Sequence, residues 1–572
     1  MEEKYMKFSE LAYNRPDIAK ICENLSALTE KMIAAPDAKT QIELINEKEQ
    51  LLSDFGTNAT IASIRHSIDT RDAFYEAENN FFDENGPVLE EKAQDFMNAV
   101  LDSKFRAELE EKFGKLIFIN MEMAKKTFSP EIIPLLQKEN ALTSEYQKLY
   151  ATTTVEIDGK TLPITKLSPY KQSPDREVRK TAFYAEGKAF DGRRADFDRI
   201  YSELVAVRTE MAHKLGYDNF VSLAYDRLGR NCYDKNKVAA FREQIAKDMV
   251  PIVAGVKERQ RARIGVETLK FYDDPFMFTD GNPKPHGTSE DILAAGKQMY
   301  HELSAETKEF IDFMYDGEFF DVLAKDGKAP GGYCTEIFGY KAPFVFSNFN
   351  GTSGDVDVLT HEMGHAFAAY RALRQDTLHE LKNPTMETCE CHSMSMEFLT
   401  APYHELFFKE DTKKYELSHA EDSLIFLPYG CMVDEFQHII YERPELSPQE
   451  RNEVWLGLEK KYRPHVEFED IPFYSAGAGW QRQLHIFMYP FYYIDYCMAQ
   501  TIAFEFYMLS LKNREEAFAK YLAFVDMAGT ATFEDIVKNA GLVLPYEEGA
   551  IASIAGELDD YVKNVLAKNF EA

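Results

Sequence analysis

Residues 352–365 read TSGDVDVLTHEMGH, and the rest of the sequence is interpreted outward from this stretch. Its last five residues, His361 to His365, form an HExxH motif. Residues four apart on a helix lie on the same face, so both imidazoles can meet one metal ion. Glu362 is one position away from His361, where its carboxylate can activate a water molecule instead of binding the metal. The motif predicts a hydrolytic zinc site.

The residues around the motif favour one continuous helix. Thr352 to Asp355 come close to a capping-box pattern, which is typical of a helix start. From Val356 to Ala372 only Gly364 weakens the helix, and a glycine there can instead allow a close approach by the metal or by a neighbouring helix. Asp357, one turn before His361, is a candidate partner for a metal ligand.

The third metal ligand has to come from outside the motif. A catalytic zinc ion usually has three protein ligands and one open position for water. The metzincin pattern needs a histidine at position 371, and Arg371 excludes that class. A second helix is predicted after Asn383-Pro384, and we predict that Glu390 on it is the third ligand. Glu397, two turns further on, is a second candidate partner for a ligand.

The neighbours of Glu390 leave one alternative open. Cys389, Cys391 and His392 can also bind metals, so a mixed cysteine and histidine site is possible. Thiolates mostly build closed structural sites. We therefore expect Cys389 and Cys391 to be small buried residues beside the site.

Elsewhere the apolar residues recur mostly at helical spacing. A hairpin is predicted where Asp158-Gly159-Lys160 separates two short β-prone runs. A second strand-like zone covers residues 331–350 and ends at the turn pair Asn350-Gly351. The predicted fold class is mostly α, with a small sheet just before the metal motif.

Composition narrows the possible partners and compartment. The 572 residues include 96 acidic and 65 basic ones, a net charge of -31, and so nucleic acid is not an expected partner. The first residues lack the pattern of a secretory peptide, and no apolar run is long enough to cross a membrane. Seven scattered cysteines do not form a disulfide framework. We expect a cytoplasmic protein with no membrane partner and no obligate protein partner.

Four segments of the chain resemble the thimet oligopeptidase family of zinc peptidases, especially its oligoendopeptidase F and Pz-peptidase branch. They are residues 344–352, 355–365, 390–397 and 485–496, with a weaker likeness at 215–219. The resemblance covers roughly residues 170 to 560, so we expect a helical N-terminal region at 1–170 and a catalytic region at 171–572, with lobes interleaved in sequence. It implies a two-lobed helical ellipsoid with a deep central channel that admits unfolded peptides. It also implies that Glu390, followed by Ser393, is the third ligand of one Zn²⁺ ion.

The same resemblance implies a histidine and two tyrosines that face the metal. His485, Tyr489 and Tyr496 match the family's spacing here, and the preceding Gly477-Ala478-Gly479 is predicted to act as a hinge. The other aromatic residues of this segment are expected to pack in the core.

These residues predict an endopeptidase that hydrolyses short unfolded peptides. Glu362 is the predicted general base, and a phenol is the predicted oxyanion partner. The strand before the metal helix is predicted to pair with an extended substrate by its main chain. Its expected contact residues are Phe346, Ser347, Asn348 and Gly351. The alternatives are a dipeptidyl carboxypeptidase of the same family and a non-catalytic peptide-binding protein.

Overall fold

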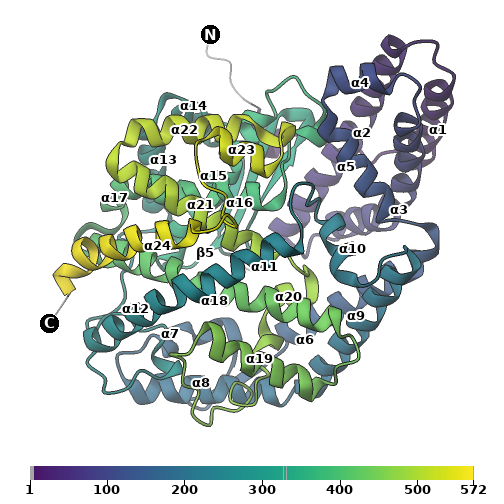
Figure 1. The fold of residues 1–572 in the computed structure, drawn as a ribbon. Helices are drawn as coiled ribbons and strands as arrows, with labels where there is room; N and C mark the ends of the chain where they lie inside the picture. Colours follow the sequence, from purple (N-terminus) through teal and green to yellow (C-terminus); the bar gives the residue numbers. More distant parts are fainter. Residues whose placement is uncertain (1–5, 326, 330, 571–572) are drawn as a thin grey trace. The chain divides into compact units, whose positions relative to one another are not determined.

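The computed structural model describes residues 6–325, 327–329 and 331–570 (Figure 1). The fold is mostly helical with little sheet, as predicted. Residues 1–5, where the sequence was searched for a secretory leader, lie outside the described residues. Within the described residues, no helix is both long enough and apolar enough to span a bilayer.

The chain forms two compact units, and each unit is assembled from three separate stretches of sequence. The first unit contains residues 1–125, 284–410 and 509–542, and the second contains 126–283, 411–508 and 543–572. The boundary expected after residue 170 therefore falls inside the second unit.

The first unit contains the metal motif and one three-stranded sheet. The order of the strands is β3-β5-β4, with β3 parallel and β4 antiparallel to the central β5. Tyr333 of β4 and Asp321 of β3 both face Phe346 of β5 in the register. The elements of this unit are α1 (Ile18–Ala34), α2 (Ala38–Ile68), α3 (Ala73–Leu101), α4 (Arg106–Phe113), α5 (Lys115–Lys126), α13 (Ser289–Leu303), α14 (Ala305–Asp316), β3 (Phe320–Leu323), β4 (Tyr333–Ile337), β5 (Ala342–Phe349), α15 (Gly354–Ala372), α16 (Met386–Leu399), α17 (Glu405–Phe408), α22 (Arg514–Asp526) and α23 (Phe533–Asn539).

The second unit contains the predicted hairpin, β1 and β2, whose turn residues Asp158 and Gly159 both have positive φ, as a tight hairpin requires. Its other elements are helices, and the last turn of α21 falls in the first unit. The elements are α6 (Ile133–Ala151), β1 (Thr154–Ile157), β2 (Lys160–Pro163), α7 (Ser168–Lys171), α8 (Arg176–Asp191), α9 (Arg194–Lys214), α10 (Phe220–Arg227), α11 (Lys235–Gln244), α12 (Val250–Arg263), α18 (Thr412–Glu442), α19 (Pro448–Tyr462), α20 (Leu484–Met488), α21 (Tyr493–Lys512) and α24 (Ala550–Tyr561).

The core of the N-terminal helices follows from their apolar spacing. On α1, Ile21, Leu25, Leu28 and Met32 recur at steps of three and four, and all four are buried. The side chain of Asp17 caps this helix by accepting a hydrogen bond from the Lys20 N–H. Closer to the metal motif, α15 packs against β4 and β5 of the sheet and against helices α14, α16 and α22, so the motif is held by elements from several parts of the first unit (Figure 1).

Candidate active site

Helix α15 carries the HExxH motif, as predicted. The rings of His361 and His365 are 5.0 Å apart between centroids, and both are half-buried. The predicted capping box is not formed, because Ser353 already has helical φ and ψ and its side chain caps nothing. Instead the Asp355 carboxylate accepts hydrogen bonds from the N–H groups of Asn350 and Gly351, at 2.8 and 2.7 Å. This contact ties the start of the metal helix to the end of β5.

Glu390 on α16 completes a set of three possible metal ligands. Its Oε2 lies 3.4 Å from His361 Nε2 and 3.5 Å from His365 Nε2. Two ligand atoms that each lie about 2.0–2.1 Å from a tetrahedral zinc ion are about 3.4 Å apart. The three ligand atoms lie within 4.8 Å of one another, and they are the only such metal-competent group among the described residues. A two-histidine, one-carboxylate donor set of this size fits a catalytic zinc ion.

The distance between α15 and α16 is set by Gly364. A Cβ at this position would lie 2.7 Å from the Ser393 Cα and 2.9 Å from the His392 carbonyl oxygen. Real side chains do not approach backbone so closely, so only glycine permits this crossing. The close packing expected from the sequence is therefore against the neighbouring helix, and it brings Glu390 to the two histidines.

The electrostatic environment of the three ligands favours a cation. The His361 Nδ1 is 2.7 Å from Glu397 Oε1, and Ser393 Oγ donates a hydrogen bond to Glu390 Oε2 at 3.1 Å. Burial alone would lower the pKa of His361, but Glu390 and Glu397 hold this pKa well above its usual value. Burial would raise the pKa of Glu390, but His365 and His361 hold it well below its usual value. The raised pKa of His361 and the lowered pKa of Glu390 both indicate that the site stabilises positive charge.

Glu362 lies on the same helix but belongs to a different part of the site. Burial raises the pKa of its carboxyl, although His361 and His365 oppose that shift. Its Oε1 would lie 3.8 Å from a Cβ placed on Gly332, the residue that precedes β4. The carboxylate is therefore close to the metal ligands and also close to the end of one strand.

β4, the strand next to Glu362, lies at an edge of the three-stranded sheet, whereas β5 lies at its centre. β5 is paired on both sides between Val345 and Phe346, so the prediction that its main chain binds an extended substrate is wrong there. The predicted contact residues also have partners within the protein, and their contact with substrate stays a prediction. Phe346 stacks on Tyr333 at 4.9 Å, and Asn348 donates hydrogen bonds to backbone carbonyls of the preceding loop. Ser347 is buried, and the positive φ of Gly351 forms the turn after the strand.

The neighbours of Glu390 that could have formed a mixed cysteine and histidine metal site lie outside the group of candidate ligands. Cys389, Cys391 and His392 do not join the metal-competent group within the described residues. Burial lowers the pKa of His392 to about 3, so its imidazole is neutral. The backbone carbonyl of His392 accepts a hydrogen bond from the Tyr521 hydroxyl of α22 at 2.8 Å. Asp357 lies in the first turn of α15, and its partnership with a ligand stays a prediction.

In the second unit, residues 485–496 form what we call the tyrosine segment, from His485 to Tyr496. The His485 ring is surrounded by tyrosines, with centroids 6.2 Å from Tyr489, 5.8 Å from Tyr496 and 4.8 Å from Tyr493. Gln483 Nε2 is 3.0 Å from His485 Nδ1 and orients this ring. Tyr489 is 55% exposed, which is unusual for so large a side chain. The three residues that the family resemblance implies thus lie in one cluster.

The predicted hinge before this segment has another explanation. Gly477 has a φ of +76°, and a Cβ there would lie 2.4 Å from the Asn452 carbonyl oxygen of α19. Gly477 is therefore required by a left-handed backbone and by close packing. These two demands account for the glycine without any hinge motion.

The comparisons with known proteins agree with this geometry. The model of the family described as Peptidase family M3 matches residues 169–555, more than half of the chain. The chain belongs to peptidase family M3. The Peptidase M3 N-terminal domain matches residues 8–128 as well. The resemblance to oligoendopeptidase F and Pz-peptidase drawn from the sequence is thereby confirmed.

Solved and curated M3 peptidases match along most of this chain. The structure described as Pz peptidase A with an inhibitor is 46% identical, has a TM-score of 0.93, and the match covers 99% of this chain and 100% of that one. Oligopeptidase PepF of Bacillus subtilis is 23% identical over 92% of this chain and 80% of its own length. Oligoendopeptidase F of Lactococcus lactis subsp. cremoris is 24% identical over 69% of this chain and 65% of its own length.

Sequence reasoning missed one part of this M3 peptidase site, the approach of β4 to Glu362, the predicted general base. The signal was present as Gly331-Gly332 directly before a strand, because paired glycines there mark a close approach of backbone. It was passed over because the aromatic run of β5 gave the stronger strand pattern. The contact between Glu397 and His361, by contrast, lies where a partner of a metal ligand was expected.

Proposed function

We propose that this M3 peptidase is a zinc-dependent oligoendopeptidase that hydrolyses internal bonds of short unfolded peptides, with one Zn²⁺ per chain. The observation that carries the proposal is the triangle of His361, His365 and Glu390 with the carboxylate of Glu362 beside it. The names of the relatives, an oligopeptidase and an oligoendopeptidase, support the same substrate class. No disulfide joins the seven cysteines, all of which are described, and we propose a reducing, cytoplasmic compartment.

The residues divide the chemistry among them. A zinc ion held by the three ligands would act as a Lewis acid that polarises the scissile carbonyl and makes a water molecule more acidic. Glu362 takes the proton of the attacking water and returns it to the leaving amine. Its burial raises its pKa above the usual value of a carboxyl, which makes the carboxylate a stronger base toward water. Glu397 holds His361 in orientation through Nδ1, so that Nε2 lies beside Glu390 Oε2 and would be available to a metal ion.

The substrate main chain is proposed to pair with the outer edge of β4. No other strand pairs with β4 among the described residues besides β5. An extended peptide that adds to this edge passes Gly332, and Gly332 is next to Glu362. Main-chain pairing recognises the length and extended shape of a peptide more than the identity of its side chains. Such recognition agrees with a broad preference for unfolded peptides.

His485, Tyr489 and Tyr496 are proposed to stabilise the oxyanion and the leaving group. A phenol O–H donated to the developing negative charge stabilises the transition state more than the bound substrate. The exposure of Tyr489 supports this role, because a phenol that only packed in the core would be covered.

The test combines metal analysis with mass spectrometry of the products from a series of peptides of increasing length. Peptides of roughly 5 to 20 residues should be cut at internal bonds, because an unfolded peptide can pair as a strand. A folded globular protein should stay intact over the same time. Release of C-terminal dipeptides alone would identify a dipeptidyl carboxypeptidase, and binding without cleavage would identify a non-catalytic peptide-binding protein.

Glu362→Gln should keep both the fold and the zinc while lowering kcat by about 100- to 10,000-fold, because an amide cannot accept the proton of water. Zinc content, circular dichroism and turnover are measured on one preparation. Turnover close to that of the unmodified enzyme would assign the general base to another residue.

A further inference from the structure

The tyrosine segment contains one residue in a conformation that its side chain disfavours. Phe491 has a φ of +68°, the left-handed region, and its ring is fully buried. For a bulky residue this conformation is a true outlier that persists only when its surroundings enforce it. Phe491 lies between Tyr489 and Tyr496, where α20 has ended and α21 has not begun. Its backbone therefore decides the direction in which the chain runs between the two phenols.

Both peptide groups of Phe491 are held by side chains from distant parts of the second unit. Gln437 Oε1 on α18 accepts the Phe491 N–H at 3.0 Å, while Gln437 Nε2 donates to the Val433 carbonyl oxygen at 3.2 Å. Arg230 Nη2 donates to the Phe491 carbonyl oxygen at 2.6 Å and to Asp495 Oδ1 at 2.7 Å. Gln437 is fully buried and Arg230 is 5% exposed. We call this pair of contacts the Phe491 clamp.

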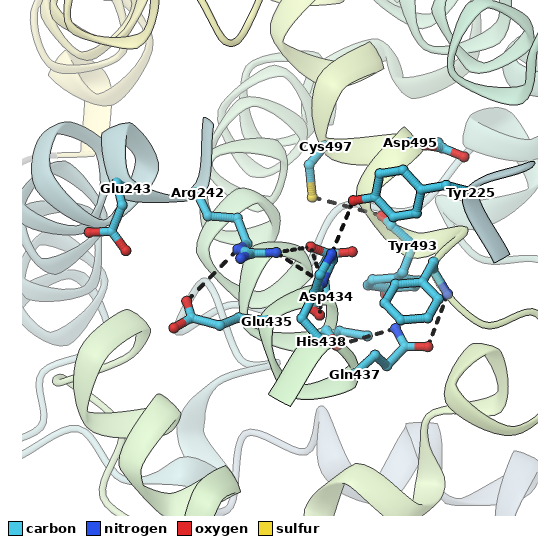
Figure 2. Close-up of polar contacts among 12 residues, drawn as sticks. Tyr225, Arg242, Glu243, Asp434, Glu435, Gln437, His438, Tyr493, Asp495 and Cys497 are labelled. Atoms are coloured by element: carbon cyan, nitrogen blue, oxygen red, sulfur yellow. Dashed lines mark hydrogen bonds and ion pairs between the residues drawn. The ribbon is translucent and has the colours of Figure 1, made fainter. Parts of the chain in front are cut away.

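The ring of Phe491 is fixed by a second set of contacts. It packs edge-on against the His438 ring, with centroids 4.8 Å apart. His438 is itself held between Tyr225, whose hydroxyl is 3.0 Å from Nε2, and Arg242, whose Nη1 is 3.0 Å from Nδ1. Asp434 pairs with Arg242 and with His438 (Figure 2). Burial alone would raise the pKa of Asp434, but His438 and Arg242 lower it to about 2, so the carboxylate is charged.

A network of this kind is costly if stability is its only purpose. Burying charged groups carries a desolvation penalty that their mutual attraction often fails to exceed, and well-packed apolar residues commonly do as well. The network and the clamp surround one residue with a strained backbone, and the aromatic cluster of His485 lies on the same segment. Strain enforced from several sides is characteristic of sites whose geometry matters for function.

We propose that Gln437 and Arg230 are positioning residues for hydrolysis, which hold Phe491 in its left-handed conformation so that Tyr489 and Tyr496 present their hydroxyls in the catalytic orientation. The inference rests on the proposed function, because it assigns these two residues to the step in which the phenols act. Neither residue touches the substrate. Their effect is transmitted by the backbone of residues 489–496.

The test is Gln437→Met, which keeps the length of the side chain and removes the acceptor for the Phe491 N–H. A displacement of about 1 Å in a catalytic group can cost on the order of 100-fold in rate. We expect kcat to fall by about 10- to 100-fold with KM and zinc content nearly unchanged. Gln260→Met is the matched control, because Gln260 is equally buried and bonds three backbone carbonyls of another loop in the same unit. It should lower the melting temperature as much and leave kcat close to normal.

A double-mutant cycle separates positioning from general destabilisation. If Gln437 acts through the phenols, then Gln437→Met should have little further effect on kcat when Tyr489 and Tyr496 are both already phenylalanine. If it only weakens the fold, its effect should be the same in both backgrounds, and the proposal would be overturned. Normal kcat in Gln437→Met itself would overturn it too. Normal kcat in the tyrosine variants would instead remove the catalytic role proposed for the phenols, and an active Glu362→Gln enzyme would remove the proposed mechanism.

A second pair of variants covers the case in which Gln437→Met does not fold. Phe491→Gly and Phe491→Ala both lose the ring, but only glycine adopts a positive φ without strain. The glycine variant should therefore keep several-fold more kcat than the alanine variant. Equal kcat in the two would show that the backbone conformation of residue 491 does not matter, and would overturn the proposal.

Discussion

The candidate metal ligands and the tyrosine segment are held in place in two different ways. His361, His365 and Glu390 project from two regular helices, and the geometry follows from helical periodicity and from one close crossing at Gly364. The tyrosine segment runs from the end of α20 through the non-helical residues 489–492 into α21, and its central residue, Phe491, is held by side chains from elsewhere in the second unit. The arrangement of the three candidate ligands uses residues close in sequence and an unstrained helical backbone. The arrangement of the tyrosine segment uses contacts between distant parts of the sequence and contains one strained residue.

This difference suggests which substitutions each region tolerates. A site built on helix repeats should depend on individual ligands and on the distance between two helices. A site built on an irregular segment should depend on contacts that do not touch the substrate at all. The predictions below test these two dependences, beginning with the largest effect.

Glu390→Ala should remove zinc together with activity, because a site with two protein ligands holds the ion far more weakly than one with three. Even the loss of an outer partner costs about 10- to 100-fold in affinity, so the loss of a ligand should exceed about 100-fold. Zinc content after dialysis, together with turnover, measures it. Cys391→Ala is the control and should still bind the metal. Stoichiometric zinc in Glu390→Ala would show that the third ligand is another residue.

Tyr489→Phe and Tyr496→Phe should each lower kcat by about 10- to 1,000-fold with little change in KM or zinc content, because the lost hydrogen bond is made mainly in the transition state. Phenylalanine keeps the ring, so packing around His485 should survive. Steady-state kinetics on one peptide substrate measure the effect. Tyr493→Phe is the control, since Tyr493 is assigned to packing. A change confined to KM would make these tyrosines substrate-binding groups instead.

Gly364→Ala should lower the free energy of unfolding by about 1–3 kcal/mol, since the new methyl group meets the backbone of α16. It should also weaken zinc retention, because α16 has to move away and takes Glu390 with it. Gly457→Ala is the matched control, a helical glycine with open space around its Cα. That change should raise the free energy of unfolding by about 0.5–1 kcal/mol. Equal effects of the two changes in urea titrations would contradict the role given to Gly364.

The smallest effect concerns pH and α21, the helix that continues the tyrosine segment. Burial raises the pKa of Glu505 from 4.5 to about 7, although the Val543 N–H opposes the shift. The folded state therefore binds this proton more tightly than the unfolded state, and stability falls as pH rises from about 4.5 to about 7. Glu505→Gln should remove this loss, by about 1–3 kcal/mol at pH 8 and by nothing at pH 4. Equal stabilisation at both pH values would show that the carboxyl is not the cause.

The sequence alone predicted the part of the site that depends on spacing. The four-residue step from His361 to His365 and the hairpin at Asp158-Gly159 follow from local rules, and the structure has both. The central position of β5 could not be predicted from its own residues. β3 and β4 pair with its two sides, and the residue pattern of a strand does not show which other strands will pair with it. Asp355 also fitted a local capping rule but bonds the turn after β5 instead.

The Phe491 clamp could not be predicted from local sequence rules. Gln437 precedes the tyrosine segment by a whole helix, and Arg230 comes from a separate stretch of the second unit. Neither residue belongs to a recognisable motif, and a buried glutamine or arginine is rarely expected from composition alone. Gly477 shows the same limit from the other side. The sequence predicts a hinge there, and the close approach to Asn452 of α19 could not be foreseen, because it depends on a helix elsewhere in the chain.

The assembly of each unit from three stretches of chain has a consequence for biosynthesis. Helices α15 and α16, with all three candidate metal ligands, leave the ribosome well before α22, which packs against both and whose Tyr521 donates a hydrogen bond to the backbone of His392. At about 5 to 20 residues per second, the nascent enzyme spends several seconds with these helices made and their cover still to be synthesised. During that interval the surface of α15 and α16 that α22 covers in the finished unit is still open to solvent. A nascent chain that has just completed α16 therefore holds all three candidate ligands but lacks one of the packing partners that position them in the finished enzyme.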